Sequence, residues 1–336
     1  MRVCVVGGTG NISTGIVRLL IDEGHEVTCF NRGQTPGLHP KAKLIRGDRK
    51  ADPAGFEAAM QGERFDAAID MICSFPEFAR SDLRAFAGVK HFIQVSTVCT
   101  YGVRYDWLPV TEDHPLRPIT DYGRNKVAAD NVFMEAYHRE GFPVTIIKPS
   151  TTYGPSWDML RQVGLDAGWV DRVEKGKPLV VCGDGQAAHQ FLYADDAAPA
   201  FVYALGRATC LGQTYNMVRR GFTTWADYHR TAMKVIGREV ELVGVPLATM
   251  QAAKVPDLGR CENIFSYNTI YSAEKLFRDV PEFQPKVSLE EGLTRVLESM
   301  KQRGHIPNSD LLTWEDRLIA AQRHVGPSVG DAAPSS

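Results

Sequence analysis

The N-terminal half of the chain alternates short apolar runs with segments of helical spacing, and this alternation restricts the fold more than any other feature. Apolar runs occur at residues 2–8, 26–31, 42–48, 65–72, 90–97 and 143–150. Segments of helical spacing lie at residues 12–23, 53–61, 75–88 and 122–140. Strands that are apolar along their whole length are typical of a parallel sheet covered by helices on both faces. Right-handed crossovers then predict an α/β, Rossmann-type, doubly wound parallel sheet.

The strand–helix rhythm loosens after residue 154. We expect residues 1–154 to form the nucleotide-binding Rossmann domain, with later segments returning to it. Residues 155–324 are expected to form mainly a smaller, mixed α/β substrate-binding lobe. The last residues, 325–336, are small and polar, which predicts a flexible tail.

Composition disfavours several classes of protein. The chain has 336 residues, is 44% hydrophobic and carries a formal net charge of −2, so it lacks the bulk positive charge typical of nucleic-acid binding. It has no apolar run long enough to span a bilayer and does not begin like a signal peptide. Its seven cysteines are scattered and never form C-x-x-C, which favours a reducing cytoplasm without disulfides or a zinc site. We therefore expect a cytoplasmic protein with no metal, nucleic-acid or membrane partner.

The turn after the first predicted strand, "VVGGTGNIS", is the first candidate binding element. Gly7 and Gly10 allow a tight turn and let backbone N–H groups approach a pyrophosphate at the N-terminus of the following helix. Ser13 stands where a third glycine is usual. In this strand–turn–helix context the motif predicts a dinucleotide site, and the alternative is a glycine-rich turn that binds nothing.

The end of the second predicted strand bears on the choice of cofactor. NAD-binding folds usually place an acidic residue there, which accepts hydrogen bonds from the adenosine ribose. This chain has Asn31 and Arg32 instead. A guanidinium matches a 2′-phosphate in charge and in geometry, so we favour NADP over NAD. The alternative is that Arg32 is a solvated turn residue.

Further motifs follow in order along the chain: "RGD", "VSTVCTYG", "VTEDHPLRP", "YGRNK", "KPSTTYGP", "FLYADDAA" and "YSAEK". With "GGTGNIS", this series resembles the extended short-chain dehydrogenase/reductase family, which includes sugar-nucleotide epimerases, dehydratases and reductases. The resemblance spans nearly the whole chain. It also implies a homodimer, because the family pairs through the helix of the Tyr/Lys motif and its neighbour.

The resemblance implies that Tyr122 is the catalytic acid/base, Lys126 its partner, and Thr97 a hydrogen-bond donor to the reacting oxygen. A free tyrosine has a pKa of about 10, too high for a general base at neutral pH. A lysine one helical turn away, with a nicotinamide cation beside it, favours the phenolate and lowers that pKa. Lys126 can also hold the hydroxyls of the nicotinamide ribose.

The resemblance also implies which residues contact cofactor and substrate. The expected cofactor contacts are Gly7, Thr9, Gly10, Asn11, Ile12, Asn31, Arg32, Asp48, Ile72, Lys126 and Pro149. The expected substrate contacts are Thr97, Thr151 and His189. His189 stands where nucleotide-sugar enzymes of the family usually carry an arginine for the substrate diphosphate. An imidazole is a poorer diphosphate ligand, so His189 contacts a smaller polyol or sugar, or is an ordinary hydrogen-bonded histidine.

The residues after Thr97 narrow the chemistry. The family's 4,6-dehydratases carry an Asp-Glu pair there, and its decarboxylases carry a glutamate two residues on. This chain has Val98 and Cys99, which disfavours both reactions. Cys99 occupies the place of the cysteine acid/base in epimerase-reductases of the GDP-fucose synthase type, but the histidine partner is missing. Cys99 is therefore either an acid/base or a small thiol that fills space.

We predict an NADP-dependent oxidoreductase or epimerase that acts on a secondary alcohol or ketone of a sugar or sugar derivative, nucleotide sugars included. An epimerase would regenerate its cofactor within one turnover, whereas a reductase would consume NADPH. One alternative is a cofactor-binding, RNA-associated or regulatory relative without turnover. Another is a purely structural dimer subunit.

Overall fold

The computed structural model describes residues 1–325, and these form two compact units. Unit 1 contains Met1–Gly154, Gln190–Gly221 and Ile270–Val287. Unit 2 contains Pro155–His189, Phe222–Thr269 and residues 288–325. Residues 326–336, which make up most of the predicted tail, lie outside the described residues.

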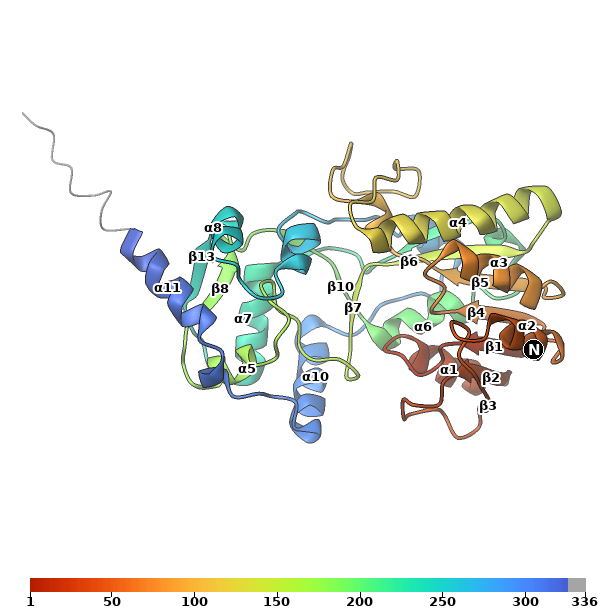
Figure 1. Ribbon diagram of the computed structural model, residues 1–336, viewed down its shortest axis with the longest axis horizontal. Helices are drawn as coiled ribbons and strands as arrows, with labels where there is room; N and C mark the ends of the chain where they lie inside the picture. The colour runs from red at the N-terminus through yellow and green to blue at the C-terminus, as the bar shows by residue number, and fades with distance from the viewer. Residues whose placement is uncertain (326–336) are drawn as a thin grey trace, which may run out of the picture. The chain divides into compact units, whose positions relative to one another are not determined.

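Unit 1 is built on a parallel sheet of seven strands in the order β11-β6-β5-β4-β1-β2-β3. Figure 1 labels the strands from β6 to β3. The strands are β1 (Arg2–Val6), β2 (Glu26–Asn31), β3 (Lys43–Arg46), β4 (Ala67–Asp70), β5 (His91–Val95), β6 (Val144–Pro149) and β11 (Thr214–Met217). The strand order changes direction between β1 and β4, and ligands of such sheets bind at the carboxyl ends of the strands there. The predicted α/β, Rossmann-type class is confirmed.

Helices cover both faces of this sheet, with α3 and α4 on one side and α1 and α6 on the other (Figure 1). The helices of unit 1 are α1 (Ser13–Asp22), α2 (Pro53–Gln61), α3 (Pro76–Ala85), α4 (Asp121–Glu140), α6 (Ala194–Val202) and α9 (Glu274–Asp279). In β1, Val3 and Val5 pack on the α1 side while Cys4 and Val6 pack on the α3 side. Both faces of the inner strands are therefore buried, which explains their continuous apolar runs, whereas the edge strand β3 is mostly exposed.

Helix α4 positions the motif that carries Tyr122. Thr120 caps its N-terminus by accepting a hydrogen bond from the Gly123 N–H, and Gly141 ends it in the left-handed conformation. The helix therefore starts immediately before Tyr122, which lies in its first turn, with Lys126 one turn later. A short additional pair of parallel strands in unit 1, β7 (Thr151–Tyr153) and β10 (Phe191–Tyr193), follows β6 and precedes α6.

Unit 2 is a mixed α/β unit. Its strands are β8 (Leu179–Cys182), β9 (Ala188–His189), β12 (Thr223–Thr224) and β13 (Leu242–Val245). Its helices are α5 (Trp169–Glu174), α7 (Trp225–Ile236), α8 (Leu247–Ala252), α10 (Leu289–Arg303) and α11 (Trp314–Val325). Strands β8 and β13 pair in parallel, whereas β9 and β12 pair antiparallel.

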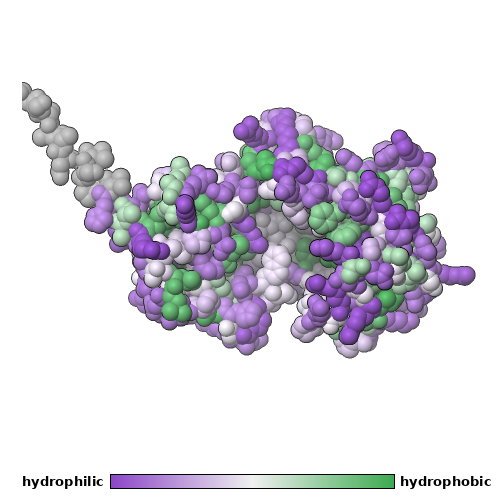
Figure 2. All heavy atoms as spheres, viewed as in Figure 1, coloured by the Kyte–Doolittle hydropathy of each residue, from purple (hydrophilic) through white to green (hydrophobic). Residues whose placement is uncertain are grey.

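The surface is mixed in character. On the face drawn in Figure 2, hydrophilic residues are interspersed with small hydrophobic patches. Within residues 1–325, no helix has both the length and the apolar character needed to cross a membrane.

Candidate active site

The structure brings Thr97 and Tyr122 together. Thr97 lies two residues after Val95, the last residue of β5. Its Oγ1 accepts a hydrogen bond from the Cys99 N–H at 3.2 Å and so caps the short helix Val98–Tyr101. The Thr97 hydroxyl lies close enough to the Tyr122 phenol to lower the pKa of that phenol. Thr97 is 8% exposed and Tyr122 is 49% exposed. The threonine hydroxyl is therefore nearly buried, whereas the tyrosine side chain is partly open to solvent.

The environment keeps both acidic groups here in their neutral forms. Burial and, to a smaller extent, the nearby Cys99 thiol raise the pKa of Tyr122 to about 12, although the neighbouring Thr97 hydroxyl works in the opposite direction. Burial also raises the pKa of the Cys99 thiol. In the protein alone, therefore, Tyr122 is a phenol at neutral pH, whereas the expected phenolate requires a nicotinamide cation beside it. The raised thiol pKa agrees with the alternative that Cys99 fills space.

Lys126 is held by backbone carbonyls. Its Nζ donates hydrogen bonds to the carbonyl oxygens of Cys73 at 2.8 Å and Val95 at 2.6 Å. The same atom lies 5.9 Å from the centre of the Tyr122 ring, and the side chain is 2% exposed. Burial lowers the pKa of Lys126. The lysine thus lies beside the tyrosine at the carboxyl ends of β4 and β5, as the motif predicts, but no direct bond joins the two groups.

A second buried lysine lies in unit 1 and was missed by the sequence analysis. Lys148 of β6 donates to the Thr100 hydroxyl at 3.0 Å, and its Nζ lies 3.9 Å from the Asp130 carboxylate. The Ser96 hydroxyl donates to the same carboxylate at 2.5 Å. Asp130 follows Lys126 by four residues on α4, so the helical spacing alone could have placed it on the same face.

The glycine turn has the features of a dinucleotide site. Gly7 adopts φ +84°, and a Cβ at this position would lie 2.7 Å from Cγ2 of Ile72. The Ser13 hydroxyl accepts the Gly10 N–H at 2.7 Å, so serine secures the turn where a third glycine is usual. Asn11 is 8% exposed, and neither its amide nitrogen nor its amide oxygen has a partner among the described residues. Buried polar atoms usually have hydrogen-bond partners, so the unpaired amide of Asn11 beside the glycine turn is suited to bind a polar ligand.

The ends of β2 and β3 carry two arginines. The Asn31 side chain accepts the Gly33 N–H at 2.8 Å and so shapes the turn itself. Arg32 is exposed and makes no ion pair within residues 1–325. Arg46, which the sequence analysis missed, lies beside Gly33, where a Cβ would be 2.5 Å from the arginine Nε. The signal that could have identified Arg46 is its position opposite Asn31 in the parallel register.

The other predicted cofactor residues lie in unit 1 with differing exposure. Asp48 is half-buried and accepts the Lys50 N–H at 2.9 Å. Ile72 is 43% exposed. Pro149 ends β6 and is buried, and the next residue, Ser150, has a buried hydroxyl without a partner in the described chain. The cofactor candidates Thr9 and Ile12 in the glycine turn are half-buried. Thr151, the predicted substrate contact at the start of β7, is also half-buried.

His189 lies in unit 2 and is sealed. It is 2% exposed, its Nδ1 is 2.6 Å from the Thr269 hydroxyl, and its ring packs against Trp225 and Phe265. Burial lowers the pKa of His189 to about 3, so the imidazole is neutral. This arrangement is that of the ordinary hydrogen-bonded histidine, the alternative reading of the sequence.

The parallel sheet, the glycine turn and the group of Thr97, Tyr122 and Lys126 resemble the arrangement of α/β proteins of the short-chain dehydrogenase/reductase type. Comparisons with known proteins agree. Residues 82–217 match the sequence model of the NAD dependent epimerase/dehydratase family. The chain is 28% identical to 2′-dehydrokanamycin reductase of Streptomyces kanamyceticus over 287 residues, covering 85% of this chain and 81% of the relative.

Two further proteins are similar to this chain at lower sequence identity. The chain is 24% identical to the chloroplast stem-loop binding protein of 41 kDa b of Arabidopsis thaliana, covering 95% of this chain and 84% of the relative. The crystal structure of UDP-glucuronic acid 4-epimerase from Bacillus cereus, in complex with UDP-glucuronic acid and NAD, superposes with a TM-score of 0.71 at 20% identity. The superposition covers 90% of this chain and 100% of the epimerase chain. At this identity the similarity shows that the two chains share a fold. Together the comparisons confirm the resemblance to the extended short-chain dehydrogenase/reductase family.

Proposed function

We propose that the protein is an NADP-dependent oxidoreductase or epimerase that acts on a secondary alcohol or ketone of a sugar-type substrate. The observation that carries the proposal is the meeting of Tyr122 and Thr97 at the end of β5, with Lys126 beside them. One relative is named as a reductase and one structural neighbour as a 4-epimerase. Both outcomes need the same proton transfer at the substrate oxygen.

Tyr122 is the proposed proton donor and acceptor. With its pKa raised to about 12, the phenol is an acid at neutral pH, so it suits the reduction direction, in which the substrate oxygen gains a proton. The Thr97 hydroxyl would hold the same oxygen. In the oxidation direction the pKa of Tyr122 must fall, and positive charge near the phenol, from Lys126 and an oxidised nicotinamide ring, favours the phenolate.

The cofactor proposal depends on unit 1. A nicotinamide cofactor supplies or accepts the hydride. The Gly7 turn would bind its pyrophosphate, and the unpaired polar atoms of Asn11 and Ser150 would find partners in it. Arg32 and Arg46 are two guanidinium groups at adjacent strand ends, which supports a 2′-phosphate and hence NADP. NAD remains the alternative.

Unit 2 contains a cavity with cationic side chains. A cavity of about 330 Å³ is lined by Trp157, Arg260, Arg303 and His305, among others. Asp158 accepts a hydrogen bond from Arg303 at 3.1 Å and so orients that guanidinium, whereas Arg260 is exposed and makes no ion pair within the described chain. Two guanidinium groups and an indole suit a sugar that carries phosphate or carboxylate.

Two other activities are less well supported. We expect no 4,6-dehydratase reaction, because Val98 and Cys99 follow Thr97 and supply no carboxylate. An RNA-binding role has one relative named as a stem-loop binding protein in its favour. The net charge of −2 and the Thr97–Tyr122 contact favour an enzyme.

The test begins with the purified protein. Any nucleotide that it retains is released and identified, and sugars, sugar acids and nucleotide sugars are then screened for NADPH oxidation or epimer formation. Tightly retained NADP(H) with epimer formation would indicate an epimerase. NADPH oxidation by a protein that purifies without nucleotide would indicate a reductase. A protein that binds neither NADP nor NAD would contradict the proposal.

A further inference from the structure

Residues 71–75 connect β4 to α3 and contact two parts of the proposed site. Ile72 lies against Gly7, close enough that a Cβ there would be 2.7 Å from its Cγ2. The Cys73 carbonyl accepts a hydrogen bond from Lys126 Nζ at 2.8 Å. The conformation of this one loop therefore bears on both the glycine turn and the lysine.

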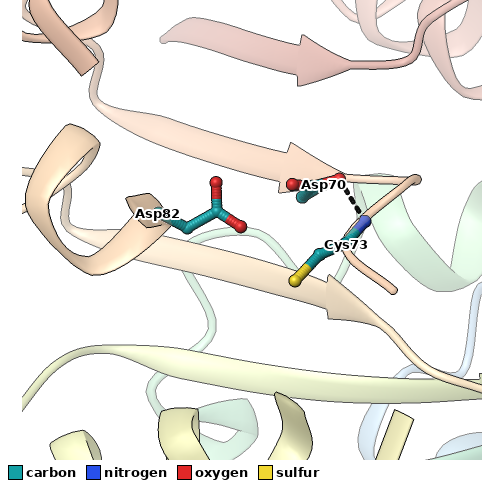
Figure 3. A group of neighbouring side chains, drawn as sticks. All are labelled: Asp70, Cys73 and Asp82. Carbon is teal, nitrogen blue, oxygen red and sulfur yellow. Dashed lines mark hydrogen bonds between the residues drawn. The ribbon is translucent and has the colours of Figure 1, made fainter. Parts of the chain in front are cut away.

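Asp70 holds the loop in place. Its Oδ1 accepts a hydrogen bond from the Ile72 N–H at 2.6 Å. The same oxygen accepts a hydrogen bond from the Cys73 N–H at 2.8 Å (Figure 3). Its other oxygen, Oδ2, accepts a hydrogen bond from Arg49. Asp70 is fully buried, so no water competes for either oxygen. A carboxylate is needed because the two oxygens face two different sets of donors.

Arg49 is in turn fixed from several directions. It is 3% exposed, and its Nη2 donates to the Phe78 carbonyl at 2.9 Å and to Asp82 at 2.8 Å. Its guanidinium carbon lies 4.5 Å from the centre of the Phe56 ring and 4.7 Å from that of Phe78. A planar cation clamped between two rings and two carboxyl groups has little freedom to move.

The carboxyl groups of Asp70 and Asp82 lie with the Cys73 thiol in one group, in which the potential ligand atoms are all within 4.8 Å of one another (Figure 3). Arg49 already bonds to both carboxyl groups, so it supplies the positive charge that a metal ion would bring. Burial and the neighbouring Asp70 raise the pKa of Asp82 well above its ordinary value. Replacing a buried ion cluster by apolar residues is often neutral or stabilising, so stability alone is a weak reason for such a group.

We propose that Arg49, Asp70 and Asp82 form a positioning cluster that sets the 71–75 loop, and through it the Gly7 turn and Lys126, for cofactor binding. This inference rests on the proposed function, because it takes the glycine turn and Lys126 to be cofactor contacts. None of the three residues touches the reacting atoms. Their effect passes through backbone groups of Ile72 and Cys73.

The test compares isosteric variants by calorimetric titration with NADP⁺ and by urea unfolding. Asp70→Asn leaves one oxygen for Arg49 and the two loop N–H groups, so a buried donor loses its partner and the Kd should rise about tenfold or more. Asp82→Asn keeps an oxygen for Arg49, and its Kd should stay within about threefold of wild type. The matched control is Glu315→Gln in unit 2, whose carboxylate also accepts from an arginine and a backbone N–H, at 2.8 and 2.7 Å. It should lose stability and keep the wild-type Kd.

The outcomes separate the two levels of the proposal. A wild type that binds neither NADP⁺ nor NAD⁺ would contradict the proposed function. A wild type that binds while Asp70→Asn binds equally well, or while Glu315→Gln weakens binding as much, would overturn only the positioning role. If Asp70→Asn does not fold, the amide hydrogen exchange of Ile72 and Cys73 in the wild type tests the positioning role instead. Slow exchange that slows further with NADP⁺ supports the proposal, and exchange as fast as in an exposed loop overturns it.

Discussion

Both units bury polar and charged side chains, but the two units differ in whether an exposed side chain lies beside the buried groups. In unit 1, Lys126 is 2% exposed, and beside it lies Tyr122, which is 49% exposed. In unit 2, His189, His229 and Glu315 are 1–2% exposed, and their partners are themselves buried. Burial and a shifted pKa are therefore not enough to indicate chemistry. A buried group becomes a candidate for function when it lies beside a side chain that a ligand can reach.

The largest effect that this comparison predicts is for Tyr122→Phe in unit 1. Phenylalanine keeps the ring and removes the only proton that we assign to the transfer, so kcat should fall by about two to four orders of magnitude. NADP⁺ affinity and the unfolding free energy should change little, since the side chain is partly exposed. Turnover is measured on the substrate that the screen identifies. Wild-type turnover by this variant would remove Tyr122 from the mechanism.

Lys126→Met should lower kcat less than Tyr122→Phe does, but it should also weaken NADP⁺ binding. It leaves the Cys73 and Val95 carbonyls without their donor, which costs about 1–3 kcal/mol when such groups stay buried. We expect both kcat and NADP⁺ affinity to fall. Lys148→Met is the control, because Lys148 is equally buried and bonds to Thr100. Lys126→Met with unchanged NADP⁺ affinity would show that the lysine does not contact the cofactor.

Arg32→Ala tests the choice of cofactor. Loss of a guanidinium from a 2′-phosphate should weaken NADP⁺ binding by about 1.5–3 kcal/mol and leave NAD⁺ binding nearly unchanged. Arg46→Ala should act in the same direction because the two side chains lie at adjacent strand ends. Titrations of both variants with both nucleotides measure the change. Equal affinity of the wild type for NADP⁺ and NAD⁺ would contradict the assignment of either arginine to the phosphate.

His189→Asn in unit 2 should have the smallest effect on turnover and should appear instead in the pH dependence of stability. The pKa of His189 is about 3 in the folded protein and about 6.5 when unfolded, so only the unfolded chain gains this proton between these values. Folding stability is therefore lost as pH falls from about 6.5 to 3, by at most about 1.4 kcal/mol per pH unit. The variant should flatten that slope in urea unfolding from pH 7 to 4. A large loss of turnover at neutral pH would instead support a substrate contact for His189.

The sequence predicted those parts of the fold that depend on local pattern. Six of the seven sheet strands follow from continuous apolar runs, and α4 follows from its spacing. Strand β11 was missed because "TYNM" is short and Asn216 interrupts its apolar character. Its place beside β6 depends on pairing between segments far apart in the chain, which no local pattern reveals.

The candidate site shows the same limit. The motif predicted that Thr97 and Tyr122 meet, because each has a recognisable neighbourhood in the sequence. The acceptors of Lys126 are backbone carbonyls, which any residue supplies, so Cys73 and Val95 leave no signal in the sequence. The apparent substrate contact at His189 depended on alignment to a family position, and burial by Trp225 and Phe265 could not be foreseen from it.

The central claim is that the carboxyl ends of the unit 1 strands bind NADP. Calorimetric titration of the purified wild-type protein with NADP⁺ and with NAD⁺ tests it most directly. The account predicts one nucleotide site per chain, with NADP⁺ bound about tenfold or more tightly than NAD⁺, as a charged contact to the 2′-phosphate requires. Absence of binding by both nucleotides, in protein shown to carry no nucleotide from purification, would contradict the account.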